Sequence, residues 1–75
     1  MASADLTSVF VTNLRREIHR SRCSQSELGR RCGWPPARIT ELLKGKFDPR
    51  LGTIEKIAKA LEVAPSSLLT PISPR

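Results

Sequence analysis

The sequence predicts an all-α protein folded as one compact bundle of five helices. Residues that favour helices dominate it, and no stretch alternates apolar and polar residues as a strand would. Apolar residues recur instead at the three- and four-residue spacing of a helix. A chain of 75 residues has room for one domain, near the lower size limit of a self-sufficient core. That size leaves no room for a large catalytic cleft.

The first helix is expected from about Leu6 to Arg20, and residues 1–5 before it are expected to be flexible. Apolar residues recur at four-residue intervals in this segment, which places them on one side of a helix. The predicted core stripe consists of Leu6, Phe10, Leu14 and Ile18, with Val11 beside it. The charged residues of the segment, Glu17 among them, fall largely off that stripe.

Residues 24–45 predict two short helices joined by a tight turn. Ser24 is a favourable N-cap, and Glu27 is three residues on, where a capping-box partner would be. The first helix of the pair is therefore expected over Gln25–Cys32. Gly33 would end it, because glycine adopts the left-handed conformation without a Cβ clash.

The second helix of the pair is expected over Ala37–Lys44, with Gly45 closing it. Pro35 and Pro36 suit its start, since proline is tolerated in the first helical turn and not in the helix interior. Gly29 has no side chain, so this second helix could cross close above it. The residues expected to face the core are Leu28 and Cys32 in the first helix, Trp34 in the turn, and Ile39, Leu42 and Leu43 in the second.

The remainder of the chain predicts a fourth helix over Leu51–Leu61 and a short fifth helix over Pro65–Leu69. The two leucines of the fifth helix either complete the core or form a subunit contact. The folded domain is thus expected over residues 6–69, with a flexible tail over residues 70–75. The apolar face of the fourth helix consists of Leu51, Ile54, Ile57, Ala58 and Leu61.

The charge of the chain is unevenly distributed. The formal net charge is +6, and most of the excess lies in residues 15–50, which include the helix pair. A basic zone of this kind is typical of a protein that binds a polyanion such as nucleic acid. From charge alone, the alternative is a solvated charged surface without a partner.

The cysteine and histidine content predicts no metal site and no cofactor. Cys23 and Cys32 are too few for a disulfide framework or a zinc site, and His19 is the single histidine. Both thiols are expected to pack in the core, and a bridge between them would require Cα atoms within ~7 Å. No secretory signal and no apolar run near the ~18 residues of a membrane span is present, so we expect a cytoplasmic protein with no membrane contact.

Several residues of the helix pair fall at the spacing of a known motif. They are Gln25, Leu28 with Gly29, Gly33, Ile39, Leu42, and Gly45 with Lys46, followed by the stretch LGTIEKIAKALEV. In this pattern, residues 6–69 resemble the helix-turn-helix domain of the phage-repressor/Cro-like (XRE-type) family. The resemblance implies a sequence-specific DNA-binding transcription regulator, acting as a repressor. No enzyme is expected, because no catalytic residue set or phosphate loop is visible in the sequence.

The resemblance also implies how such a domain would bind double-stranded DNA. Residues 36–44 would enter the major groove, and a homodimer would read two half-sites about one helical turn apart. The dimer contact is expected at the fifth helix and the end of the fourth. No small-molecule effector is evident.

The candidate base-reading residues form the outer face of the groove-inserted helix. They are Pro36, Ala37, Thr40, Glu41 and Lys44. Thr40 could hydrogen-bond a base edge, and Glu41 could accept from a cytosine amino group. Alternatively, Glu41 pairs on the helix surface with Arg38 or Lys44. The candidate phosphate-contacting residues are Ser24, Gln25, Arg38, Lys46 and Arg50.

A different class of function would use the same helical fold. The chain could be a protein-interaction module, or an antitoxin that binds both a toxin and its own promoter. Dependence on salt distinguishes the two classes, because DNA binding releases counterions and protein binding at a small apolar contact does not.

Overall fold

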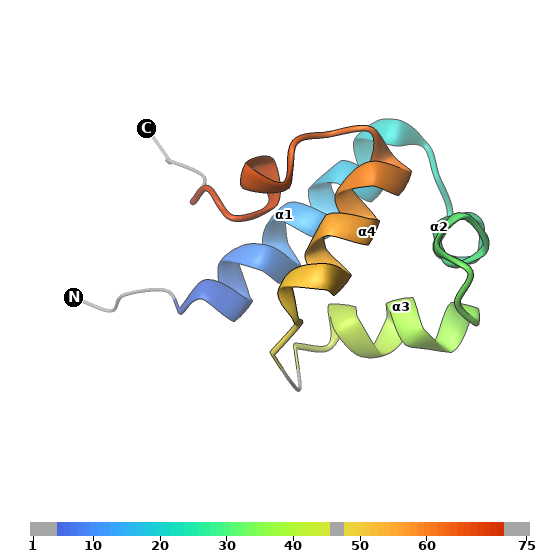
Figure 1. Ribbon diagram of the computed structural model, residues 1–75, viewed down its shortest axis with the longest axis horizontal. Helices are drawn as coiled ribbons and strands as arrows, with labels where there is room; N and C mark the ends of the chain where they lie inside the picture. Colours follow the sequence, from blue (N-terminus) through green and yellow to red (C-terminus); the bar gives the residue numbers. More distant parts are fainter. Residues whose placement is uncertain (1–4, 46–47, 72–75) are drawn as a thin grey trace.

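Four α-helices and one 3₁₀ turn follow one another in residues 5–45 and 48–71, which are the residues that the computed structural model describes (Figure 1). They are α1 (Leu6–Ser21), α2 (Gln25–Cys32), α3 (Pro36–Leu43), α4 (Leu51–Leu61) and the 3₁₀ turn η1 (Pro65–Leu68). No strand occurs within these ranges, so the all-α prediction is confirmed. In the same ranges, no helix combines the length and the apolar character that crossing a membrane requires.

The predicted fifth helix is the one element whose type is wrong. Ser67 N–H bonds to the Ala64 carbonyl at 2.9 Å and Leu69 N–H to the Ser66 carbonyl at 3.0 Å, which is the i→i−3 pattern of a 3₁₀ helix. The segment spans four residues, too few to offset the entropic cost of starting an α-helix. The fold is therefore a four-helix domain closed by a 3₁₀ turn.

The local signals around α2 act as predicted, with one exception. The Ser24 hydroxyl accepts a hydrogen bond from Glu27 N–H at 3.0 Å, and Gly33 takes a left-handed conformation with φ 76° at the helix end. The exception is the capping box, because the Glu27 carboxylate does not reach back to Ser24. It pairs instead with Arg30 and Arg31 further along the same helix.

The core is formed by side chains from all five elements. Its most deeply buried apolar members are Phe10, Leu14, Leu28, Ile39, Ile57 and Leu68. Figure 1 shows α1 and α4 at the centre, with α2 and α3 along one side and η1 on the other. Cys23 and Cys32 are both free and buried in this core, which confirms their predicted packing role. Burial raises the pKa of the Cys32 thiol, against the opposing charge of Lys56.

The predicted stripe of α1 is only partly correct. Phe10 and Leu14 are buried, but Leu6 is 59% exposed and the buried face also includes Val9, Asn13 and Glu17. α1 is covered by α3, α4 and η1 together, so its buried face is wider than a single four-residue row. Leu6 lies in the first turn, beyond these neighbours.

Asn13, a fully buried residue of α1, holds the C-terminal end of the domain. Its Nδ2 donates to the Leu68 carbonyl at 3.0 Å and to the Thr70 carbonyl at 2.9 Å. Thr70 is the first residue of the predicted flexible tail, and residues 72–75 of that tail lie outside the described residues. At the other end, Asp5 caps α1 by accepting from Ser8 N–H at 2.7 Å, and residues 1–4 likewise lie outside them.

Candidate nucleic-acid interface

α3 lies on the outside of the domain, along the lower edge in Figure 1, beside α2, which is seen end-on. Its buried face consists of Ile39, Leu42 and Leu43. The opposite face is covered by nothing else in the described part of the chain. Since α3 packs mainly on α2, the position of this free face is set by the α2–α3 crossing.

The crossing depends on Gly29, in the middle of α2. A Cβ atom there would lie 3.0 Å from the Trp34 carbonyl oxygen and 3.4 Å from Pro36 Cα. The backbone leaving α2 therefore passes almost against this glycine. Trp34 N–H also donates to the Gly29 carbonyl at 2.8 Å, which fixes the turn between the helices.

All five candidate base-reading residues lie on the free face of α3. Pro36, Ala37, Thr40 and Lys44 are exposed, and Glu41 is half-exposed. The structure therefore places them together, as the helical period predicts. In the free protein this surface offers one hydroxyl, one carboxylate, one ammonium and a small apolar area.

Thr40 is held by the start of α2. Its hydroxyl donates to Gln25 Oε1 at 2.9 Å and lies 3.4 Å from the Pro36 carbonyl. A Gln25 side chain bonded through Oε1 keeps its amide N–H groups as donors. A candidate base-reading residue and a candidate phosphate-contacting residue are thus joined, which their separation of 15 positions did not indicate.

Glu41 takes the surface pairing that was the alternative to base reading. Its carboxylate lies 3.5 Å from Lys44 Nζ, and both side chains are close to half exposed. Such an exposed pair contributes about 0–1 kcal/mol, so it is easily exchanged for contacts with DNA. Of the two partners considered for Glu41, the structure selects Lys44.

Arg38 is held in a different way, over an aromatic ring. Its guanidinium carbon lies 4.7 Å from the centroid of the Trp34 ring, and Lys56 Nζ of α4 lies 6.0 Å from the same centroid. The sequence predicts Trp34 only as a core residue of the turn and indicates no role for Lys56. The spacing of Trp34 and Arg38 is compatible with this contact, but Lys56 is brought in by the packing of α4.

The other candidate phosphate-contacting residues lie at three places. Ser24 and Gln25 are exposed at the start of α2, where free backbone N–H groups and the positive end of the helix dipole favour an anion. Arg50 is exposed and is the N-cap residue of α4. Lys46 lies outside the described residues.

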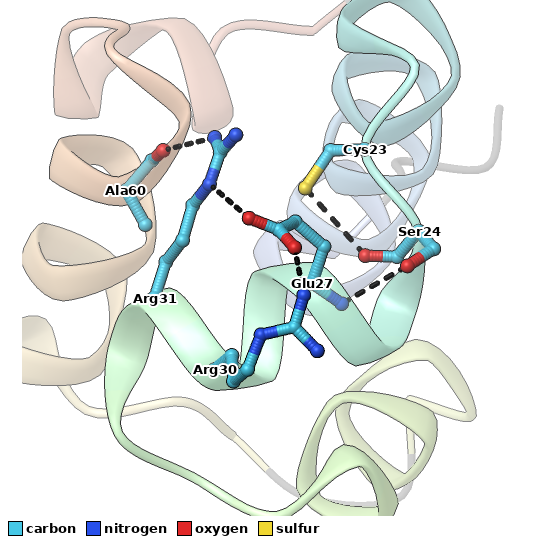
Figure 2. A network of polar contacts seen from close by, with 6 residues as sticks. All are labelled: Cys23, Ser24, Glu27, Arg30, Arg31 and Ala60. Carbon is cyan, nitrogen blue, oxygen red and sulfur yellow. Dashed lines mark hydrogen bonds and ion pairs between the residues drawn. The ribbon is translucent and has the colours of Figure 1, made fainter.

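Several arginines of the basic zone have structural partners instead. Figure 2 shows Glu27 between Arg30 and Arg31, with Arg31 also donating to the Ala60 carbonyl of α4 at 3.1 Å. A hydrogen bond from Arg31 and the charge of Arg30 lower the pKa of the Glu27 carboxyl. Arg15 of α1 donates to the Leu43 carbonyl at 3.1 Å and so satisfies the end of α3. The spacing of Arg30 and Arg31 from Glu27 indicates their ion pairs, but no sequence pattern predicts the bonds to the Ala60 and Leu43 carbonyls.

Comparison with known proteins gives consistent matches over most of the chain. The model of the Cro/C1-type helix-turn-helix DNA-binding domain matches residues 13–74. A hypothetical transcription factor of Neisseria meningitidis serogroup B (strain ATCC BAA-335 / MC58) is 36% identical over 67 residues, which cover 89% of this chain and 63% of that protein. The chain thus spans slightly less than two thirds of that relative.

Two solved structures share the fold. The crystal structure of the hypothetical transcription factor NHTF from Neisseria superposes with a TM-score of 0.84 at 36% identity, covering 89% of this chain and 77% of that one. The solution structure of the SOS-response transcriptional repressor LexA from Eubacterium rectale gives a TM-score of 0.79 at 25% identity, covering 95% and 76%.

Proposed function

The chain belongs to the Cro/C1-type helix-turn-helix DNA-binding domain family, and we propose that it is a transcriptional repressor that reads double-stranded DNA with α3. The observation that carries this proposal is the free outer face of α3. It lies between the start of α2 on one flank and a ring-stacked arginine on the other. B-DNA admits one α-helix in its major groove, where base edges present distinguishable donors and acceptors.

The proposed base contacts follow from the chemistry of that face. Thr40 accepts from a base amino group while its O–H stays bonded to Gln25, or it touches a thymine methyl group. Lys44 donates to guanine once its pairing with Glu41 is exchanged. Glu41 then accepts from a cytosine amino group. Pro36 and Ala37 supply apolar contact and set how closely the helix approaches.

The proposed phosphate contacts fix the orientation of α3 without reading sequence. The start of α2 offers backbone N–H groups and the Gln25 amide, and Arg38 approaches the backbone from the opposite flank of α3. Lys46 is a further candidate from its sequence position, whereas Arg50 lies next to Leu51, at the subunit contact proposed for the homodimer. With about four to eight phosphates contacted, log K is expected to fall against log[salt] with a slope of roughly −4 to −7.

Substitution of Thr40 and Glu41 together by valine and glutamine is expected to change the preferred DNA sequence at a nearly constant salt slope. These side chains contact bases in the proposal, and the substitutions keep their size. Lys46→Ala, at a candidate phosphate-contacting residue, is expected to weaken binding to all sequences alike and to reduce the magnitude of the slope by about 1. Selection of sites from a random duplex pool, followed by binding titrations at several salt concentrations, measures both effects.

The matched control is Lys59→Ala, which removes an exposed lysine of α4 outside this face. It is expected to alter neither the selected site nor the affinity by more than about twofold. If the Thr40/Glu41 variant selects the same site as the wild type, the choice of base-reading residues is wrong. A flat salt response of the wild type would favour the protein-interaction function instead.

We further propose that the repressor is a homodimer, but with a contact different from the predicted one. Leu68 of η1 is fully buried in the core of its own subunit and cannot reach a partner. The large apolar side chains that are exposed in the described residues are Leu6, at 59%, and Leu51, at 80%. Both lie at helix starts and line a hollow of about 430 Å³ together with Pro49 and Leu69.

The charges around this hollow fit a second copy of the same chain. Asp5 and Asp48 are acidic and exposed there, and Arg50 next to Leu51 is basic and exposed. A twofold axis through the apolar centre allows Arg50 of each copy to face an acidic residue of the other. Thr7 donates to Asp48 at 2.7 Å and so keeps the start of α1 beside the segment before α4.

Leu51→Ser is expected to convert the dimer to a monomer and to weaken binding to a palindromic site more than tenfold. The side chain is 80% exposed within the subunit, so the unfolding temperature of the subunit should hardly change. Sedimentation over a range of protein concentrations measures the mass, with Lys59→Ser as the control. An unchanged dimer mass in the Leu51 variant, or a monomeric wild type bound to a non-palindromic site, would reject this interface.

A further inference from the structure

Trp34 brings together side chains from the turn, α3 and α4. It is half-buried, with one part of the ring packed against the core and two cations over it. Arg38 is the closer, at 4.7 Å from the ring centroid, and Lys56 is at 6.0 Å. Both distances fall within the ~6 Å range in which a cation is attracted to an aromatic face.

The position of Arg38 on α3 shows on which side of the proposed DNA-facing surface the contact with Trp34 lies. Arg38 and Thr40 are two residues apart, so they lie about 160° apart around the helix axis. Thr40 marks the flank next to the start of α2, because it is bonded to Gln25. Arg38 therefore marks the opposite flank, and the face proposed to enter the groove lies between the two residues.

Stacking holds an arginine without using its hydrogen-bond donors. A guanidinium group that lies over a ring keeps the N–H groups at its planar edge, which match the oxygens of a phosphate. Other arginines of the basic zone are fixed through those donors, as Arg15 is by the Leu43 carbonyl and Arg31 by Glu27 and the Ala60 carbonyl. Arg38 thus combines a restricted position with side-chain N–H groups that have no acceptor among the described residues.

We propose that Trp34 is a positioning residue for DNA binding, which holds Arg38 ready to contact a phosphate on the flank of α3 opposite to α2. This inference rests on the proposed insertion of α3 into the major groove. A side chain restrained before binding loses less conformational freedom on binding, so the stacked arginine binds the phosphate more tightly than a free one.

A double-mutant cycle on Trp34 and Arg38 tests the proposal. Arg38→Ala is expected to weaken DNA binding about tenfold, as the loss of a charged hydrogen bond does. Trp34→Leu keeps an apolar side chain in the turn and is expected to weaken binding about two- to fivefold. The two changes combined should weaken it no more than Arg38→Ala alone, since Trp34 then has no arginine to hold.

The cycle is measured on the DNA site selected by the wild type and on a random-sequence duplex, at a temperature where circular dichroism shows every variant folded. A phosphate contact is lost equally on both duplexes. Trp34→Phe retains an aromatic ring in the turn and should fall between the wild type and Trp34→Leu. It also supplies a second cycle if the leucine variant does not fold.

The outcomes separate this inference from the proposed function. If the effects of the Trp34 and Arg38 substitutions multiply, Trp34 acts only on the fold and the inference is wrong, while DNA binding by α3 stands. If Arg38→Ala leaves the affinity unchanged, the phosphate contact itself is absent and the inference is also wrong. A wild type that binds neither duplex overturns the proposed function and the inference together.

Discussion

Replacing Gly29 with valine is expected to destabilise the domain by about 3 kcal/mol and to abolish sequence-specific DNA binding. The added Cβ would lie 3.0 Å from the Trp34 carbonyl oxygen, 3.4 Å from Pro36 Cα and 3.5 Å from the Pro35 carbonyl carbon. All three are backbone atoms, so no side-chain rotation relieves the contact. The start of α3 must move away from α2, and with it the whole free face of α3.

The same substitution at Gly52 is the matched control. Gly52 is an exposed residue of α4, and a Cβ atom built there has no heavy atom within 4 Å. Gly52→Val is therefore expected to change the free energy of unfolding by less than about 0.5 kcal/mol, in the stabilising direction, because valine favours a helix more than glycine does. Urea unfolding and DNA titration of both variants provide the comparison. Equal stability of the two variants would show that the crossing tolerates a side chain at Gly29.

The turn between α2 and α3 could be predicted from the sequence because its signals are local. The Ser24 cap, the left-handed Gly33 and the proline at the start of α3 each act within a few residues, and the structure confirms all three. The spacing of Ile39, Leu42 and Leu43 likewise identified the buried face of α3 and, by exclusion, its free face.

The errors in the predicted fold arose where burial depends on distant elements. Leu6 and Leu51 have the correct spacing for a core position, yet each lies in the first turn of its helix, where no other element covers it. The helical period predicts Glu17 on the outer side of α1, but Glu17 is buried, with Arg16 and Arg20 within salt-bridge distance of its carboxylate. A periodic pattern describes one helix, whereas burial depends on what packs against it.

In the candidate site, too, local features could be predicted from the sequence and contacts between distant elements could not. The residues of the α3 face follow from the helical period, and the structure brings them together. The hydrogen bond from Thr40 to Gln25 joins α3 to α2, and the cation–π contact of Lys56 with Trp34 joins α4 to the turn before α3. Such pairs follow only from the arrangement of the helices, since spacing along one helix gives no information about them.

Asn13→Asp is expected to be among the most destabilising single-atom changes in the domain, costing about 4 kcal/mol at pH 7. The Asn13 amide donates to the Leu68 and Thr70 carbonyls, and its Oδ1 is buried without a partner among the described residues. A carboxylate at this position has no donor. It would place a buried negative charge about 3 Å from two carbonyl oxygens, and both hydrogen bonds to the chain end would be lost.

Gln25→Glu makes the same chemical change at an exposed site and serves as the control. The new carboxylate would lie at the start of α2, where the helix dipole favours negative charge, and it can still accept from Thr40. A stabilisation of about 0.3–1 kcal/mol is expected there. Thermal unfolding of the two variants beside the wild type separates the effect of burial from the effect of the substitution itself.

The pH dependence gives the Asn13 prediction a second, independent measurement. Burial and the two carbonyls disfavour ionisation, so the pKa of the new carboxyl is raised in the folded state above its unfolded value of about 3.9. The free energy of unfolding of the variant, relative to wild type, therefore falls as pH rises from the unfolded-state pKa to the folded-state pKa. It recovers as pH falls below the folded-state pKa. A protonated carboxyl also regains one donor for the Leu68 or Thr70 carbonyl. If the stability difference between variant and wild type is the same at pH 7 and at pH 4, Asn13 does not hold the chain end in the manner described.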